Sequence, residues 1–144
     1  MNRTRIATQA GFTLLEILLV VIIISMLVGV AVVNLVPKVQ ESKITATRDQ
    51  IHNYESALDL YVLDNGILPS TEQGLQALIA QPTSTPVPGN WKGPYLKPPI
   101  LRPDAWNHPF IYRNPGQHNT TSYDILSPGP SGQEGSDDNI GNWQ

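Results

Sequence analysis

The sequence predicts an α+β protein in which one long N-terminal helix precedes a small domain with a short antiparallel sheet. Three observations lead to this fold class. An apolar run from Leu14 to Val36 continues into a segment with helical periodicity that reaches Asp64. A proline-rich stretch from Gln81 to Asp104 then interrupts regular structure. Short strand-like segments follow it in the last third of the chain.

The apolar run is rich in Leu, Val and Ile, and its only charged residue is Glu16. At about 1.5 Å per residue, Leu14 to Val36 can cross a hydrocarbon core of about 30 Å as a single helix. The preceding segment, Met1 to Gly11, carries Arg3 and Arg5 and no acid. We therefore expect one membrane pass, with the leader in the cytoplasm and the remainder of the chain across the membrane.

Glu16 is the residue of this run that calls for a function, because a carboxylate in a membrane-length segment is costly without a partner. A secretory signal would have a shorter apolar region with its small-residue cleavage site behind it, whereas here Gly11 lies in front. A cut after Gly11 would leave the helix on the mature chain. The new α-amino group of Phe12, with a pKa near 8, would lie one helical turn from Glu16. A plain membrane anchor with a stray glutamate is the alternative.

The helix is expected to continue beyond Val36 to the C-capping sequence Asp64-Asn65-Gly66. Pro37 is a point where it can bend or break. Apolar residues at seven-residue spacing and an adjacent row predict that one face of this second half packs on the domain. The residues of this predicted buried face are Ile44, Ile51 and Leu58, with Thr47, Tyr54 and Tyr61 beside them.

After this helix, Ser70 and Gln73 form a capping-box pattern that predicts a short helix from Thr71 to about Ala80. The stretch from Gln81 to Asp104 is dense in proline and predicts a loop. We expect an ordered loop, pinned to the core by Trp91, Tyr95 and Leu96. A flexible linker between two domains is the alternative.

Two short strands are predicted at Phe110 to Arg113 and Ser122 to Leu126, joined by a turn over residues 114–119. The tail from Ile140 to Trp143 can add a third strand. So small a sheet is marginal by itself, so it must pack against the long helix.

Composition excludes several classes of function. The net charge is −3, and it becomes about −5 once the leader with its two arginines is removed, so no basic surface invites nucleic acid. There is no cysteine, and the three histidines are far apart in the sequence. No nucleophile elbow or metal-protease spacing is present, so the chain is not expected to be an enzyme.

The run Gly11-Phe-Thr-Leu-Leu-Glu16, followed by an apolar helix, resembles the processing site of type IV pilins and type II secretion pseudopilins. The resemblance implies cleavage between Gly11 and Phe12 by a prepilin peptidase and N-methylation of Phe12. It also implies that Glu16 meets the N-terminal amine of a neighbouring subunit. The chain then divides into a leader (1–11), a transmembrane and assembly helix (12–36) and a periplasmic domain (37–144).

Later blocks resemble the major pseudopilins of type II secretion, and they occur in the same order over nearly the whole chain. These blocks are Leu68 to Leu75, Gly93 to Lys97, Pro103 to Pro109, Tyr112 to Gly116, Tyr123 to Ser127 and Ile140 to Trp143.

This resemblance implies a type IV pilin-like fold and a subunit that polymerises through its N-terminal helix. The filament would be a periplasmic pseudopilus that drives the export of folded proteins across the outer membrane. The implied partners are further copies of the chain, minor pseudopilins, an inner-membrane assembly platform and the prepilin peptidase. The precursor would lie in the inner membrane as a single-pass protein. The alternatives are a type IV major pilin for adhesion or motility, and a membrane-tethered binding module.

A glycine-rich acidic turn from Pro128 to Asp138 can wrap Ca²⁺, which takes oxygen ligands from carboxylates and backbone carbonyls. The resemblance implies an acid pair at Asp137 and Asp138, an upstream acid at the position of Ser131 and a carbonyl ligand at Pro128. Ser131 departs from this pattern because it is neutral, although Glu134 could compensate. A solvated acidic turn is the alternative.

Overall fold

The computed structural model describes residues 11–144, with the side chains of residues 30–36 left aside; the leader predicted for residues 1–11 therefore lies almost entirely outside the described residues. The elements are, in order, one long helix, one short 3₁₀ helix and three short strands. Two compact units are distinguished, one extending to Val39 and the other from Gln40 to Gln144.

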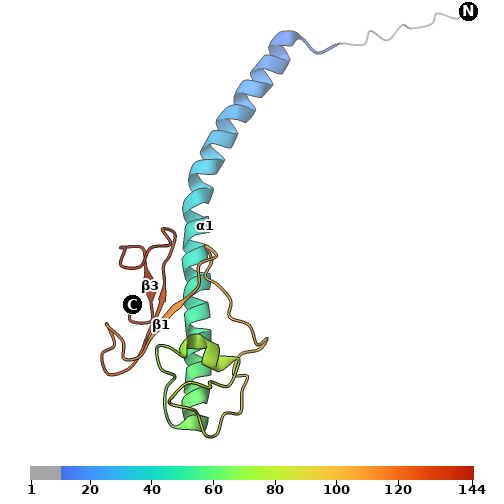
Figure 1. The fold of residues 1–144 in the computed structure, drawn as a ribbon. Helices are drawn as coiled ribbons and strands as arrows, with labels where there is room; N and C mark the ends of the chain where they lie inside the picture. The colour runs from blue at the N-terminus through green and yellow to red at the C-terminus, as the bar shows by residue number, and fades with distance from the viewer. Residues whose placement is uncertain (1–10) are drawn as a thin grey trace, which may run out of the picture. The chain divides into compact units, whose positions relative to one another are not determined.

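Helix α1 runs from Leu14 to Asn65 and continues through Pro37 (Figure 1). Thr13 caps its start, because the backbone N–H of Glu16 donates a hydrogen bond to Thr13 Oγ1 at 3.2 Å. The helix ends where the capping sequence predicts, and the N–H of Gly66 donates to the carbonyl of Val62 at 2.7 Å.

The second half of α1 buries one face, as its periodicity predicts. Thr47, Ile51, Tyr54, Leu58 and Tyr61 are all buried, whereas Ile44 is partly buried at the edge of the core. This face is the largest continuous part of the domain core. Ala57 of the same helix also belongs to the core. The other core residues come from the 3₁₀ helix, the loop and the strands: Leu75, Ala77, Leu78, Leu96, Tyr112, Ile125 and Ile140.

The short helix predicted from Thr71 to about Ala80 is present but shorter: it is a 3₁₀ helix, η1, from Gly74 to Leu78. The capping box itself is present, since the N–H of Ser70 donates to Gln73 Oε1 at 3.0 Å and the N–H of Gln73 donates to Ser70 Oγ at 3.2 Å. Gly74 then has a positive φ of 57°. A residue in this left-handed conformation cannot continue a right-handed helix, so the capped turn and η1 are separate elements.

The proline-rich segment is an ordered loop, as predicted. Trp91 Nε1 donates to the carbonyl of Ala77 at 2.9 Å, and the N–H of Tyr95 donates to the carbonyl of Leu78 at 2.7 Å. Leu96 is buried in the core. The loop is therefore held on η1 by both hydrogen bonds and packing.

The sheet is an antiparallel meander with β2 in its centre. Strand β1 is Ile111–Arg113, β2 is Asp124–Ser127 and β3 is Ile140–Gly141, so each is shorter than predicted. The register pairs Tyr112 with Ile125 and Leu126 with Gly141. All four residues of β2 are buried, and Tyr112 OH donates to the carbonyl of Pro69 at 2.9 Å, tying the sheet to the segment before η1.

Asp124 organises the turn between β1 and β2. Its buried carboxylate accepts three backbone N–H groups, from Gln117 at 2.6 Å, His118 at 2.8 Å and Asn119 at 2.9 Å. Burial opposes ionisation of this carboxyl group, but the three donors together outweigh it and lower the pKa of Asp124. The turn therefore depends on an ionised side chain.

We predict that Asp124→Asn lowers the free energy of unfolding by about 2 kcal/mol at neutral pH, because the amide presents a donor where the carboxylate accepts. A lowered folded-state pKa gives stability that is present above the unfolded value, near 4, and is lost as the pH falls through the folded value. The difference between wild type and variant, measured by urea denaturation, should therefore narrow below about pH 4. A difference that stays constant from pH 7 to pH 3 would contradict this role.

Candidate functional site

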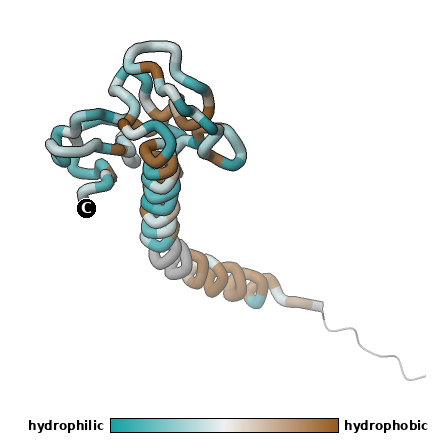
Figure 2. Tube along the Cα trace, turned by 90° about the horizontal axis from the view of Figure 1, so that it is seen from below, coloured by the Kyte–Doolittle hydropathy of each residue, from teal (hydrophilic) through white to brown (hydrophobic). Residues whose placement is uncertain are grey.

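The first half of α1 presents apolar side chains in every direction. Every Leu, Ile, Val and Met from Leu14 to Val28 is at least 46% exposed, and Phe12 in front of the helix is 79% exposed. Figure 2 shows this part of the tube as an almost unbroken hydrophobic stretch. A helix that is apolar all round is normally buried in its working environment, so this surface needs cover from outside the single chain. In the part of the chain that the structure describes, none of the helices has the length and apolarity that a membrane crossing requires.

Glu16 lies in the first turn of α1 and is exposed. A carboxylate in this position interacts favourably with the positive end of the helix dipole. Phe12 and Gly11 precede the helix, and a Cβ placed on Gly11 would meet no atom within 4 Å. The predicted processing residues therefore lie on an open segment directly before the helix.

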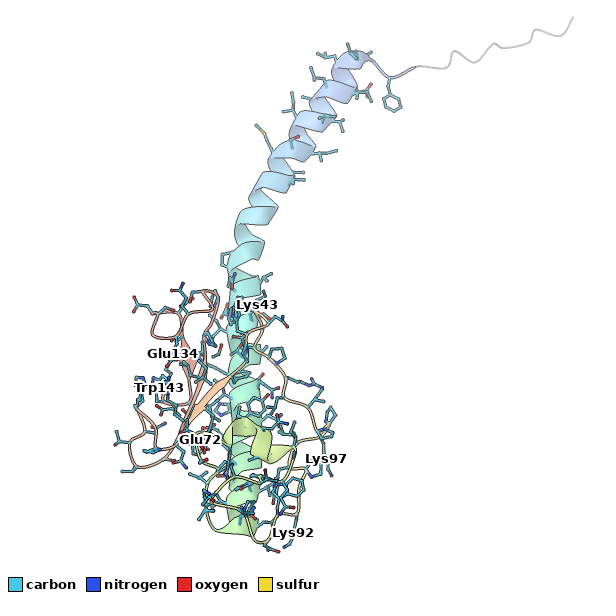
Figure 3. All side chains as sticks on the ribbon, viewed as in Figure 1. Lys43, Glu72, Lys92, Lys97, Glu134 and Trp143 are labelled. Atoms are coloured by element: carbon cyan, nitrogen blue, oxygen red, sulfur yellow. The ribbon has the colours of Figure 1, made fainter. Side chains whose placement is uncertain are left out.

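The second candidate site is the C-terminal loop, defined here as Pro128 to Asn139, between β2 and β3. Its two ends are in direct contact, because the backbone of Asp138 lies against Gly129, which has a positive φ of 67° and leaves no room for a Cβ. On the outside of the loop, the side chain of Glu134 forms an ion pair with Arg113 of β1. In Figure 3, Glu134 and Trp143 lie on the sheet side of the domain, away from Lys92 and Lys97.

Asp138 is held inside the loop by donors from serine residues. The N–H of Ser131 donates to Asp138 Oδ2 at 2.8 Å, and Ser131 Oγ donates to Asp138 Oδ1 at 2.9 Å. Ser136 Oγ also donates to Asp138 Oδ1. The bond from Ser136, followed by those from Ser131, lowers the pKa of Asp138. This carboxylate is therefore ionised and already supplied with donors.

The structure brings together three of the four residues predicted to bind calcium. Asp138 and Ser131 are hydrogen-bonded to each other, and Ser131 Oγ is 3.4 Å from the carbonyl oxygen of Pro128. Asp137 is exposed, and it lines a hollow of about 230 Å³ with Ile44 and Arg48. The neighbour of Asp138 that reaches the inside of the loop is Asn139 instead, whose amide nitrogen is 3.1 Å from the carbonyl oxygen of Pro128.

These residues fit a calcium ion poorly. Ca²⁺ needs six to eight oxygen ligands, and tight sites draw several of them from carboxylates. Among the described residues, no group of three or more acidic or histidine side chains is close enough to hold a metal ion. Inside the loop, the one carboxylate and the Pro128 carbonyl already accept hydrogen bonds from the protein. Calcium binding stays a prediction that is not tested directly.

The start of the C-terminal loop is held in place by hydrogen bonds that lead to the buried carboxylate of Asp104. Asp104 Oδ1 accepts the N–H groups of Trp106 and His108 at 2.9 and 2.8 Å, and Oδ2 accepts the hydroxyl of Ser127 at 2.6 Å. Ser127 Oγ in turn accepts a hydrogen bond at 3.0 Å from the N–H of Gly129, which lies in the first turn of the loop. His108 Nδ1 donates to the carbonyl of Gly129 at 2.9 Å, so this histidine has a structural role.

Sequence reasoning missed three of these residues: Thr13, Asp104 and Asn139. The pattern Thr13-x-x-Glu16 is a capping-box signature and could have revealed the first. Asp104 and Asn139 lie in loops without periodicity, where no spacing rule indicates which polar side chain turns inward.

A long helix with an apolar first half, whose second half carries a small antiparallel sheet, defines the class of type IV pilin-like proteins. Comparison with known sequences gives the particular family. The profile of the family described as type II secretion system (T2SS), protein G matches residues 34–143, and the chain belongs to this family.

Individual relatives agree. The chain is 42% identical over 139 residues to the type II secretion system core protein G of Pseudomonas aeruginosa. This alignment covers 94% of this chain and 95% of the relative. It is 41% identical to the protein of the same name from Escherichia coli K12, over 94% of this chain and 91% of the relative.

A solved structure agrees as well. The crystal structure of the major pseudopilin from the type 2 secretion system of enterohaemorrhagic Escherichia coli is similar with a TM-score of 0.68 and 39% identity, over 76% of this chain and 94% of that chain. The fold is thus that of a pseudopilin, and the family is one of structural subunits rather than enzymes.

We predict that Asp104→Asn lowers the free energy of unfolding by about 1–3 kcal/mol, because one of its three donors then faces an amide N–H₂ group. Urea denaturation followed by tryptophan fluorescence measures this change. The matched control is Asp137→Asn, which makes the same chemical change at an exposed position and should stay within about 0.5 kcal/mol of wild type. Equal effects of the two substitutions would contradict the bracing role of Asp104.

Proposed function

We propose that the chain is a structural subunit of the periplasmic pseudopilus of a type II secretion system and that it polymerises through the first half of α1. The observation that carries this proposal is the all-round exposure of the apolar side chains from Leu14 to Val28, headed by a single acid, in a chain of the protein G family. A membrane-tethered binding module would use such a helix only as an anchor, and Glu16 would then have no partner to compensate its charge. Assembly into a filament explains it, because neighbouring helices cover one another.

Before assembly, the apolar side chains from Leu14 to Val28 must be shielded from water by something other than neighbouring subunits. We assign this role to the lipid of the inner membrane, crossed once by the transmembrane and assembly helix (12–36), with the domain (37–144) in the periplasm. The leader carries two positive charges, and residues 12–15 carry no charge. Positive charge on the leader favours its retention in the cytoplasm, which supports this orientation. Moving from lipid to a bundle of like helices exchanges one apolar environment for another, so the transfer itself costs little hydrophobic free energy.

Glu16 supplies what the apolar surface lacks, which is a specific register. A carboxylate in an apolar bundle is strongly unfavourable unless an opposite charge meets it. Cleavage after Gly11 creates such a charge at Phe12, and N-methylation of that amine keeps it positive. Pairing of Glu16 with the Phe12 amine of a neighbour would therefore admit a subunit in only one axial position.

The partners follow from this assembly route. They are further copies of the chain, minor pseudopilins, the inner-membrane assembly platform and the prepilin peptidase that removes residues 1–11. The filament acts mechanically and promotes the export of folded proteins across the outer membrane. A type IV pilin for adhesion or motility would share the helix, but the relatives that match over the whole domain carry the name of the secretion system.

We predict that Glu16→Lys abolishes pseudopilus formation but not membrane insertion. Loss of one partner from a buried ion pair costs about 3–5 kcal/mol, which corresponds to roughly 10²–10⁴-fold weaker subunit addition. Sheared filaments are quantified by immunoblot, and insertion is measured by membrane fractionation. Glu72→Lys, the same change at an exposed position of the domain, is the control. A normal filament yield from Glu16→Lys would contradict the assembly role of Glu16 and would leave the helix with the role of a membrane anchor alone.

We also predict that the mature protein begins with a singly methylated Phe12. Intact-mass measurement and N-terminal sequencing of protein from cells that contain the peptidase test this directly. Gly11→Val should retain the leader, and since a Cβ at Gly11 meets nothing within 4 Å, we expect the substitution to leave the fold intact. Gly29 is equally open, so Gly29→Ala should be processed normally. A wild-type chain that starts at Met1 without a methyl group would overturn the proposal.

A further inference from the structure

The amide group of Asn139 lies at the centre of the C-terminal loop. Its Nδ2 atom donates to the carbonyl oxygen of Gln133 at 2.8 Å and to that of Pro128 at 3.1 Å, and it is 3.1 Å from Ser136 Oγ. Three oxygen atoms from different parts of the loop thus converge on one nitrogen. A bound cation would be surrounded in a similar way, but here the positive partner is an N–H₂ group.

The orientation of this amide is fixed by its other end. The N–H of Gly135 donates to Asn139 Oδ1 at 2.7 Å. If the amide were turned over, its nitrogen would face this N–H and its oxygen would face two carbonyl oxygens, so every one of these contacts would become repulsive. Asn139 can therefore present only hydrogen atoms, and no lone pair, to the inside of the loop.

The carboxylate beside it is balanced without a metal. Asp138 accepts one backbone N–H and the hydroxyl groups of Ser131 and Ser136, so its charge is stabilised by donors of the loop itself. Ser131 supplies two of these donors. An acid at that position would instead place a second negative charge against Asp138 and would require a cation.

From this arrangement we infer that the C-terminal loop is closed by the Asn139 amide in place of a cation, so that its folding is independent of calcium. A calcium ion would have to rotate the amide, break its bonds to Pro128 and Gln133 and release the N–H of Gly135. The two neutral residues, Ser131 and Asn139, act together: the first supplies donors to Asp138, and the second supplies donors to the two carbonyls. Calcium binding through Asp137 and Asp138 is the alternative that experiment must separate from this.

The first test is thermal unfolding of the purified full-length protein in detergent, with either a chelator or millimolar calcium chloride. We expect melting temperatures within about 1 °C of each other. A site filled at a hundredfold excess over its Kd would raise the melting temperature of a domain of this size by on the order of 10 °C. A fall of more than about 5 °C in chelator would overturn the inference. So would a calcium titration heat in wild type that Asp137→Asn abolishes.

The second test is the substitution Asn139→Asp, which keeps the size of the side chain and exchanges its donors for a carboxylate. We expect a melting temperature several degrees below that of wild type in chelator. Recovery on addition of calcium would show that the negative charge, and not a packing defect, opens the loop. Asp137→Asn is the matched control, with no change expected in either solution. An Asn139→Asp protein as stable as wild type in chelator would overturn the role of the amide. If the variant does not fold, the wild-type comparison still decides between the two views.

Discussion

The domain depends on the buried face of the second half of α1. Three strands of two to four residues cannot form a stable sheet alone, because such a sheet has too little apolar surface to bury. Ile51, Tyr54, Leu58 and Tyr61 supply that surface as one rigid row, against which η1, the proline-rich loop and the sheet all pack. The chain contains no disulfide to substitute for it. The helix is therefore both the largest contributor to the core and the continuation of the segment that assembles.

This dual role places opposite demands on one helix. From Leu14 to Val28 the helix exposes apolar side chains in all directions, which is unfavourable in water for an isolated subunit. Its second half is amphipathic and satisfied within the chain. The change occurs without a break in the helix, which continues through Pro37. Assembly can thus proceed through the first half while the folded domain is left intact.

The parts of the structure that the sequence could predict are those with a period or a local signal. The seven-residue spacing of Ile51 and Leu58 identified the buried face of α1, and the capping box at Ser70 and Gln73 is present as predicted. The short helix after it begins later than predicted, at Gly74, because the left-handed conformation of this residue separates the helix from the capped turn. The pairing of β1 with β2 was recoverable from the hairpin turn, whereas the position of β3 beside β2 and the strand lengths were not. A short strand ends where its hydrogen bonds to the neighbouring strand end, and the position of that end depends on tertiary contacts.

The polar residues inside the domain were the least predictable, for a physical reason. Asp104, Asp124 and Asn139 occur in turns, where polar residues are expected, and nothing in the spacing separates a solvated side chain from one that holds a turn together. At the C-terminal loop this matters for function. The acidic pair Asp137 and Asp138 reads as a cation site, yet the residue beside Asp138 that turns inward is the amide Asn139. A loop of this length must neutralise its converging carbonyl oxygens with something positive, and either a metal ion or N–H groups can do so. In this chain the Asn139 amide already donates to the carbonyl oxygens of Pro128 and Gln133, which supports the proposal that the loop folds without an added ion.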